Sequence, residues 1–481
     1  MATRKAAKAK KAARVRVRMY RQGLGDCFLI TVPGKAGKPF HMLIDCGVVL
    51  GTTDPAVKMA AVVEDVLEVT GNKLDVLVAT HEHWDHISGF VQVPELFEKL
   101  EVKDVWLAWT EDPADPLAKK LREERRAAEK ALRMAAQHLA VRGAKRMSEN
   151  VDSLVGFFGA KAGSTEDALN NVKKMAAGRK KPRYCKPGEP PIALEAAPAV
   201  RFWIMGPPRD EKLIKKSNPG KGDAYGLDAG PGGRQAFFMS ALSRNMGVTG
   251  AGGEDAIEEP FDEGYTIPMA RAEQLPFFAR RYFGEAGDEG VFERKSGVAV
   301  RDQSWRRIDS TWLDSSETMA LQLDSATNNT SLVIAIEIVA TGEVLLFPGD
   351  AQAGNWLSWQ ALEWKLEEGK KRVTGPELLA RTVLYKVGHH GSHNATLKAK
   401  GLELMTSEDL VAMIPVDHEM AVKKHWGKMP LPDLVDRIKE KTQGRVLRVD
   451  DAAVKPADLG PEWKTFGGEV AVTPLYYELS F

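Results

Sequence analysis

The 481-residue chain carries 67 Lys plus Arg against 66 Asp plus Glu, and 43% of its residues are hydrophobic. This is the composition of an ordinary soluble globular protein, and the near-zero net charge excludes a protein whose whole surface binds polyanions. The charge is uneven, because residues 1–21 hold nine basic residues and no acidic one, which leaves 58 basic against 66 acidic residues, a net charge of −8, for the rest. At roughly one domain per 150 residues, the length would suggest about three domains or one core with large insertions.

The cysteine content and the hydropathy of the sequence predict its compartment and its relation to membranes. Three scattered cysteines, Cys27, Cys46 and Cys185, are too few for a disulfide framework or a Cys-rich zinc module, so a reducing cytoplasm is expected. The sequence lacks a secretory signal and an 18-residue apolar run, which predicts no membrane span. Residues 1–14 are expected to be a disordered, solubilising basic tail, and weak binding of nucleic acid or another polyanion is the alternative. No feature of the sequence sets an oligomeric state.

The first third alternates short strands with one helix. Turn signals separate candidate strands at Val15–Met19, Cys27–Val32 and Met42–Ile44. Apolar residues at helical spacing follow in Ala56–Val69, and Leu74–Ala79 reads as a strand buried on both faces. A helix that leads into a buried strand is typical of an α/β fold.

The middle of the chain has a different texture. Leu117–Val141 is rich in Ala, Lys, Arg and Glu and predicts one long helix, and Val200–Met205 predicts a core strand. We interpret 111–199 and 209–320 as two insertions around this strand, which wall or cover the site. Residues 15–481 are therefore expected to form one catalytic domain with two insertions.

The last third returns to strands and helices. The expected strands are Ser331–Val339, Glu343–Phe347, Thr382–Val387, Leu410–Ile414 and Arg445–Val449, the expected helix is Leu431–Lys441, and a final apolar stretch runs toward Phe481. Two halves that each mix strands and helices predict two sheets covered by helices.

The strongest local signal is His81-Glu82-His83-Trp84-Asp85-His86, just after the strand expected at Leu74–Ala79. Imidazole and carboxylate suit Zn²⁺ or a similar first-row metal, and no cysteine is required. One ion could take His81 and His83, and a neighbouring ion Asp85 and His86.

This motif resembles the His-x-His-x-Asp-His hallmark of the metallo-β-lactamase superfamily. Three further segments resemble motifs of that family in order and spacing: Leu43-Ile44-Asp45-Cys46-Gly47, Phe347-Pro348-Gly349-Asp350 and Val387-Gly388-His389-His390-Gly391-Ser392. Gly25-Asp26-Cys27, Asn328-Asn329-Thr330-Ser331-Leu332 and His389-His390-Gly391-Ser392 resemble more narrowly the branch that contains the soluble hydrolase domain of the competence DNA-uptake channel protein. The resemblance covers about 15–110 and 325–450 and implies an α/β fold, a four-layer αββα sandwich.

The resemblance also implies roles for single residues. Asp350 would bridge two ions, His389 would be the late ligand, and Asp45 would orient a ligand imidazole. Asp85 and Asp350 would act in catalysis by orienting the nucleophile as ligands. Two structural alternatives stay open: Asp350 could cap a helix that begins at Ala351, and Asp45 could merely stabilise its turn at Gly47.

The chain departs from the common family pattern at one ligand. Most members place another histidine before the Gly-Asp motif, and here the corresponding stretch is Asn328-Asn329-Thr330-Ser331. The missing ligand could be water, His390, which we favour, or one of His393, His418 and His425. His138 lies in the long charged helix and is expected to face solvent. His41 is expected to be a sheet residue, and the tryptophans Trp356, Trp359 and Trp364 are expected to pack in the core.

The predicted activity is hydrolysis by a metal-bound hydroxide. Two ions, expected to be Zn²⁺ with Mn²⁺ as the alternative, would activate a water for attack on phosphorus or carbonyl carbon. Phosphodiester or nucleic-acid substrates are favoured by the resemblance and by the basic tail. A small-molecule lactone, thioester or β-lactam substrate is the second hypothesis, and a non-catalytic binding protein on the same scaffold is the third.

Overall fold

The structure is a computed structural model, and most of its described residues lie in one α/β unit. It describes residues 14–141, 159–160, 163–176, 181–220, 223–224, 323–366, 371–424, 426 and 429–481, with a few residues between 267 and 282. The chain divides into a unit of residues 1–126, 155–231 and 322–481 and a unit of residues 127–154 and 232–321. The described elements of the second unit are the end of α5 (Pro116–Val141), α10 (Met269–Ala272) and α11 (Pro276–Phe278). The basic tail predicted at 1–14 lies outside the described residues except for Arg14.

The first unit contains two large mixed sheets. In spatial order, the eight-stranded sheet consists of β17 (Glu469–Val472), β18 (Tyr476–Ser480), β1 (Arg16–Tyr20), β2 (Cys27–Val32), β3 (Phe40–Cys46), β4 (Lys73–Ala79), β5 (Glu101–Ala108) and β8 (Arg183–Cys185). The six-stranded sheet consists of β16 (Val446–Arg448), β15 (Val411–Ile414), β14 (Thr382–Lys386), β11 (Val344–Phe347), β10 (Val333–Ile338) and β9 (Val200–Gly206). Two short hairpins, β6–β7 (Gly159–Ala160, Gly163–Ser164) and β12–β13 (Glu363–Leu366, Lys371–Thr374), lie outside both sheets.

Both sheets change from antiparallel to parallel pairing. In the larger sheet β2 and β3 are antiparallel, while β3, β4, β5 and β8 run parallel. In the smaller sheet β10 pairs antiparallel with β9 and β11, while β11, β14, β15 and β16 run parallel. Parallel strands need crossover segments, and the helices of those segments cover the outer faces of the sheets.

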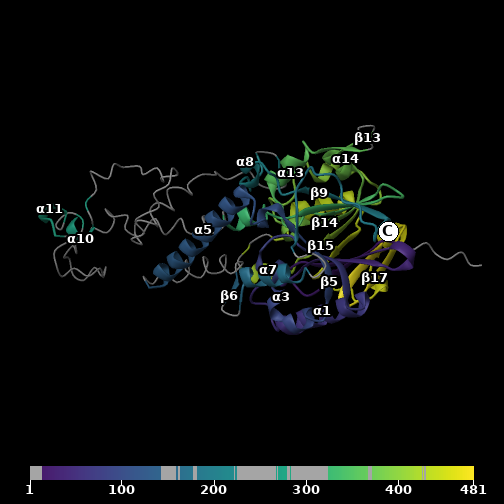
Figure 1. The fold of residues 1–481 in the computed structure, drawn as a ribbon, viewed down its shortest axis with the longest axis horizontal. Coiled ribbons are helices and arrows are strands. Elements are labelled where there is room, and N and C mark those ends of the chain that lie inside the picture. Colours follow the sequence, from purple (N-terminus) through teal and green to yellow (C-terminus); the bar gives the residue numbers. More distant parts are fainter. Residues whose placement is uncertain are drawn as a thin grey trace, which may run out of the picture. The chain divides into compact units, whose positions relative to one another are not determined.

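The helices form the two outer layers of the sandwich. Figure 1 shows α1 (Pro55–Thr70) and α7 (Thr165–Lys174) on one side of the sheets and α13 (Ala353–Trp359) and α14 (Gly375–Ala380) on the other. The remaining helices of this unit are α2 (Trp84–Ile87), α3 (Gly89–Gln92), α4 (Pro94–Phe97), α8 (Glu211–Ile214), α15 (His418–Lys423) and α16 (Pro432–Lys441). No helix among the described residues is both long and apolar enough to cross a lipid bilayer.

The core follows the alternation of side chains along each strand. Met42 and Ile44 of β3 face the cluster between the two sheets, while Leu43 faces the cluster beneath α1. Ile334 of β10 likewise faces the inner cluster, and Val333 faces the one beneath α13. Because neighbouring residues on a strand point to opposite faces, an all-apolar run is what a strand covered on both faces requires. The fold is therefore the four-layer αββα sandwich predicted from the sequence.

One segment that the sequence assigned to an insertion belongs to the larger sheet. Arg183–Cys185 form β8, which extends this sheet by pairing with β5. The apolar residues of α7 pack against the outer face of that sheet, in the same core cluster as the apolar residues of α1. The role of 111–199 and 209–320 as walls of the site stays a prediction, and most of 209–320 lies outside the described residues.

Candidate metal centre

The candidate site residues follow the carboxyl ends of parallel strands. The loop of residues 81–86, which we call the metal loop, follows β4, and Asp45 is the penultimate residue of β3, in the same sheet. Asp350 follows β11, and the turn with His390 follows β14, in the other sheet. These strand ends meet at one edge of the sandwich, where ligand sites of α/β folds commonly lie.

Four buried side chains converge at this edge: Asp85, His86, Asp350 and His390. His390 Nε2 lies 2.8 Å from Asp85 Oδ2 and 3.7 Å from Asp350 Oδ2. His86 Nε2 lies 3.1 Å from Asp350 Oδ2 and 3.9 Å from Asp85 Oδ2. Ligand bonds of about 2.0–2.2 Å in a tetrahedral zinc site place ligand atoms about 3.4 Å apart, so this set fits a four-coordinate ion.

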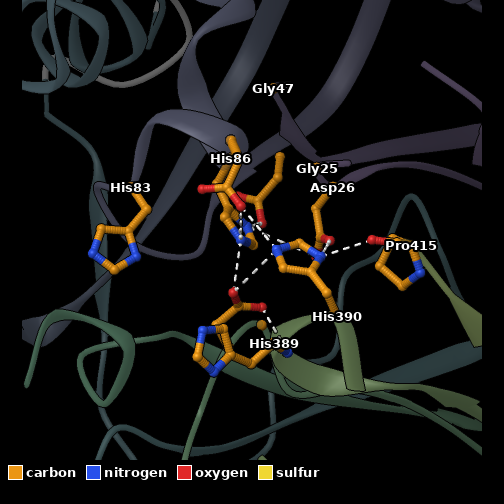
Figure 2. A network of polar contacts seen from close by, with 12 residues as sticks. Gly25, Asp26, Gly47, His83, His86, His389, His390 and Pro415 are labelled. Carbon is orange, nitrogen blue, oxygen red and sulfur yellow. Dashed lines mark hydrogen bonds and ion pairs between the residues drawn. The ribbon is translucent and has the colours of Figure 1, made fainter. Parts of the chain in front are cut away.

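The far ring nitrogens of both histidines are already held. His86 Nδ1 lies 2.7 Å from Asp45 Oδ2, and His390 Nδ1 lies 2.7 Å from the carbonyl oxygen of Pro415 (Figure 2). Each Nδ1–H can donate to its oxygen, which leaves both Nε2 atoms as the metal-facing acceptors. Asp26, Asp45 and His86 also form a compact group, but its histidine nitrogen is Nδ1. That nitrogen serves the bond to Asp45, so we interpret this group as support for His86.

His81 and His83 form a pair beside the four-residue group. His81 Nε2 and His83 Nδ1 lie 3.0 Å apart, and both side chains are buried. His81 Nδ1 lies 3.1 Å from Thr80 Oγ1, so its Nε2 is the nitrogen that faces His83. In the described part of the chain, neither histidine belongs to a group of three or more potential ligands. The structure thus brings together the two histidines predicted for one ion. The ring of His86 lies beside them, with its centroid 4.2 Å from that of His81, but its Nε2 belongs to the four-residue group.

His389 and His390 occupy different surroundings although they are neighbours in sequence. The ring nitrogens of His389 lie 3.2 Å from Asn328 Nδ2 and 2.7 Å from Ser392 Oγ, and its ring centroid lies 6.2 Å from that of His390. His390, and not His389, lies in the group with Asp85, His86 and Asp350, whereas the resemblance implied His389 as the late ligand. His390 thus belongs to that group and not to the His81–His83 pair that lacks a ligand. A ligand role for His389 stays a prediction that this placement does not favour.

The shared carboxylate of Asp350 is held at one oxygen. Asp350 Oδ1 accepts from Lys386 Nζ at 3.2 Å and from the His389 backbone N–H at 2.9 Å. Lys386 also donates to the Gly349 carbonyl at 2.9 Å and pairs with Asp26 at 2.5 Å, which uses all three of its N–H groups. Oδ2 of Asp350 is therefore the oxygen that faces His86 and His390. The helix-cap alternative for Asp350 is wrong, because α13 begins at Ala353 with Gln352 as its N-cap residue.

The buried charges shift one another strongly. Burial alone would raise the pKa of Asp85, but the nearby His86 and the hydrogen bond from His390 outweigh it and lower this pKa to about 2. Burial alone would lower the pKa of His86, but Asp350, Asp26 and Asp45 raise it above its ordinary value. Burial lowers the pKa of His83 to about 3, so this side chain is neutral at pH 7. A cluster of carboxylates around imidazoles is the electrostatic environment of a cation site.

Backbone geometry brings the loops close together. A Cβ atom on Gly47 would lie 2.5 Å from the carbonyl carbon of Asp85, so only glycine lets the end of β3 pass beneath the metal loop. His389 and His390 both have positive φ angles, 45° and 50°, in the short turn Gly388–Gly391. Non-glycine residues in this region store strain, which is often found at functional sites.

The other predicted residues lie elsewhere. His418 begins α15, and its Nδ1 bonds the Met429 carbonyl at 2.8 Å. His41 is a residue of β3 as expected, and Trp356, Trp359 and Trp364 are buried in the core as expected. Neither His418 nor His393 joins a ligand group among the described residues. His425 and the side chain of His138 lie outside the described residues.

Sequence reasoning gave no role to three residues of the site: Asp26, Lys386 and Asp324. Asp26 lies in the quoted segment Gly25-Asp26-Cys27, and that segment was its only signal. Lys386 ends β14, a strand predicted to lie in the core, and a lysine at that position of a core strand is the sequence signal that could have found it. Asp324 lies at the end of a stretch that matched no motif, so the sequence offered no signal for it.

The comparisons with known proteins concern the part of the chain that carries this metal loop. Residues 20–115 match the family model of the metallo-beta-lactamase superfamily. This stretch contains β2 to β5 and the loop from His81 to His86, and the αββα sandwich is consistent with the fold of that superfamily. The match gives no evidence for the narrower DNA-uptake branch. No curated protein matches the chain.

Proposed function

We propose that this protein is a metal-dependent hydrolase with two divalent ions, most suitably Zn²⁺, and that it cleaves phosphodiesters. The observation that carries the hydrolase proposal is the convergence of Asp85, His86, Asp350 and His390 from the two sheets at ligand-to-ligand distances. The superfamily match over residues 20–115 supports the same general activity.

The charge of the buried site supports two ions. Lys386 is the only lysine or arginine among the described residues that forms an ion pair with the buried carboxylates of the site. Five such carboxylates with one lysine leave four negative charges when the histidines are neutral, and two divalent ions supply four positive charges. Uncompensated charge is costly away from water, so this balance favours double occupancy. The five are Asp26, Asp45, Asp85, Asp324 and Asp350.

Side chains of this protein would hold the two ions, and other side chains would orient those ligands. His86, His390, Asp85 and Asp350 Oδ2 would hold one ion, and His81 Nε2 with His83 Nδ1 would hold the other. Bound ions of this kind acidify a coordinated water and stabilise the negative charge that develops on a phosphoryl or carbonyl oxygen. Lys386 holds Asp350 through Oδ1, and Asp45 holds the proton on His86 Nδ1. Both contacts keep ligand atoms aimed at the ions.

The phosphodiester part of the proposal is supported by the sequence. The segments Gly25-Asp26-Cys27 and His389-His390-Gly391-Ser392 resemble the branch that contains the hydrolase domain of the competence DNA-uptake channel protein, and the basic tail 1–14 would attract a polyanionic substrate. Like the substrate class, the cytoplasmic location remains a prediction.

The test measures metal content and substrate range together. Purified full-length protein, loaded with Zn²⁺ or Mn²⁺ and freed of excess metal, is expected to retain close to two ions per chain. It is then assayed with bis-p-nitrophenyl phosphate, single-stranded DNA and a panel of lactones. Asp85→Ala and His83→Ala are expected to abolish turnover, while His418→Ala, a histidine outside both ligand groups, is expected to retain it.

Each outcome decides a separate part of the proposal. Hydrolysis of the phosphodiester alone supports the proposal as stated. Hydrolysis of lactones alone contradicts the substrate class and leaves the metal hydrolase in place. Absence of bound metal under replete conditions contradicts the enzyme, and metal binding without any turnover would favour a binding protein on this scaffold.

A further inference from the structure

The metal-facing nitrogens of the candidate ligands are selected by what holds the opposite side of each ring. His81, His86 and His390 each have one ring nitrogen at 2.7–3.1 Å from an oxygen, supplied by Thr80, Asp45 and Pro415 respectively. The other nitrogen of His86 and of His390 then faces the four-residue group, and that of His81 faces His83. Such outer contacts fix the tautomer and the ring orientation of a metal-binding histidine. His83 is the fourth candidate, and Asp324 is the residue at its outer nitrogen.

Asp324 approaches His83 from the side opposite His81. Its Oδ1 lies 3.6 Å from His83 Nε2, while His83 Nδ1 is the nitrogen 3.0 Å from His81 Nε2. In the described part of the chain, Asp324 joins no group that also contains His81 and His83, so it does not complete the ligand set of this ion directly. Its position is that of an orienting carboxylate.

The other oxygen of the Asp324 carboxylate, Oδ2, is held by a residue one helical turn away. Asp324 and Asn328 lie four residues apart within 323–328, which are helical, and Asn328 Nδ2 donates to Asp324 Oδ2 at 3.2 Å. Oδ1 has no hydrogen-bond partner within the described ranges, although the side chain is only 8% exposed. A buried carboxylate oxygen without a donor is costly, and this one is aimed at an imidazole nitrogen.

The surroundings of Asp324 disfavour its charge in the metal-free protein. Burial raises the pKa of Asp324 well above its ordinary value, and the nearby carboxylates of Asp85 and Asp350 raise it further. Cations bound at the neighbouring carboxylates and histidines would remove that repulsion.

We propose that Asp324 is the positioning residue of the His81–His83 ion: it accepts the N–H of His83 Nε2 and so aims Nδ1 at the metal. This inference rests on the proposed metal centre. Asp324 does for His83 what Asp45 does for His86, and it is delivered by the segment just before β10, where the common family pattern would supply a histidine ligand. The contact between Asp324 and His83 would fix the orientation of His83 and so compensate for the histidine ligand that the common family pattern has and this chain lacks.

The test compares Asp324→Asn with Asp45→Asn in the full-length protein. Zn²⁺ affinity for each of two sites is measured by competition with a chromophoric chelator, with metal content as a check. Wild type is expected to bind two ions. Asp324→Asn is expected to weaken one ion about 10- to 100-fold and to leave the other unchanged, the usual cost of losing an outer contact to a ligand. Asp45→Asn is expected to weaken the ion of His86 instead.

A second readout separates positioning from a general structural role. Asp324→Asn removes a buried carboxylate oxygen that has no hydrogen-bond donor, so the thermal midpoint of the metal-free protein is expected to stay the same or rise while affinity for the ion falls. The absorption spectrum of the Co²⁺-loaded variant is expected to lose the bands of one site only. A fall of the metal-free midpoint without a change in affinity would assign Asp324 to folding and overturn the inference.

The failures of the two proposals are distinguishable. Wild type and Asp324→Asn binding two ions with equal affinity would overturn the role of Asp324 and leave the metal centre intact. Loss of both ions in Asp324→Asn would contradict a role confined to His83. A wild-type protein that binds no metal would overturn the proposed function and this inference together.

Discussion

His390 Nε2 lies 2.8 Å from Asp85 Oδ2, although 305 residues separate them in the chain. The contact joins the loop after β4 of the larger sheet to the turn after β14 of the smaller sheet. The four-residue group takes Asp85 and His86 from the larger sheet and Asp350 and His390 from the smaller one, so this group exists only when the two sheets are packed together. An ion held here would link the two halves.

The first prediction separates His390 from its neighbour. His390→Ala is expected to lower the affinity for one Zn²⁺ ion by at least 100-fold, because it removes a ligand nitrogen from the group of four. His389→Ala is expected to change that affinity less than tenfold, because the nitrogens of His389 face Asn328 and Ser392. Isothermal titration of the metal-free variants checks both values. The reverse order of effects would show that His389 is the late ligand.

The second prediction concerns stabilisation by metal. Chelation of both ions should lower the thermal midpoint, because it leaves several buried carboxylates close together without a compensating cation. A ligand present at 100 times its dissociation constant stabilises the folded state by about 2.7 kcal/mol. Calorimetry with and without a chelator measures the effect, and added Zn²⁺ should reverse it. Asp350→Asn should show a smaller metal-dependent shift than wild type, and an equal shift would remove Asp350 from the site.

The third prediction addresses the buried pair of Lys386 and Asp26, whose side chains are 1% and 2% exposed. Lys386→Met leaves Asp26 and Asp350 without their ammonium partner. Removal of one member of a buried pair usually costs about 3–5 kcal/mol of unfolding free energy. Urea unfolding of the metal-free protein measures it.

The double variant Lys386→Met with Asp26→Asn is the control for that pair. It removes both charges, so it should recover part of the lost stability. Full additivity of the two single changes would show that Lys386 and Asp26 do not act as a pair.

Most of the fold was predictable because its strands are apolar runs. Cys27–Val32 was predicted with the bounds that the structure has, and the other predicted strands differ at their ends by a few residues. Strands buried on both faces can be recognised in the sequence because nearly all of their residues are apolar. The short strand Arg183–Cys185 was not predicted, because three residues with two polar side chains carry no such signal. Its place is set by the free edge of β5.

The candidate site was predictable as a set of motifs but not as a geometry. The sequence predicted all four residues of the group formed by Asp85, His86, Asp350 and His390. The choice between His389 and His390 depends on two consecutive left-handed backbone conformations, which no residue pattern announces. Lys386 and Asp324 acquire their roles only through residues distant in the chain, Asp26 and His83, so only the folded protein shows them.

The last prediction concerns a charged network beside the metal loop. Arg125 of α5 lies with its Nε 2.7 Å from Glu82 Oε1, and Glu82 stands between His81 and His83 in sequence. The same guanidinium lies 3.6 Å from Glu111, which also contacts Lys173. The two side chains of the Arg125–Glu82 pair are 8% and 14% exposed, so the pair is largely shielded from water.

Arg125→Met should destabilise the protein by about 3 kcal/mol, because two acids lose a buried partner. The exposed neighbour Arg126, which pairs with Glu166, is the matched control, and Arg126→Met should cost less than about 1 kcal/mol. Urea unfolding at pH 7 compares the two variants. Equal costs would mean that the network beside the metal loop contributes no more than a surface ion pair.

The pH dependence of the same network has a definite sign. Burial alone would raise the pKa of Glu111, but Arg125 and Lys173 outweigh it and lower this pKa below its ordinary value. A carboxylate whose pKa is lowered by folding stabilises the protein above its unfolded pKa of about 4.3 and loses that effect as pH falls through the folded pKa. Arg125→Met raises the pKa of Glu111, so its acid unfolding should begin at a higher pH than that of wild type. Midpoints of acid unfolding followed by circular dichroism decide it, and an unchanged midpoint would exclude Glu111 from the transition.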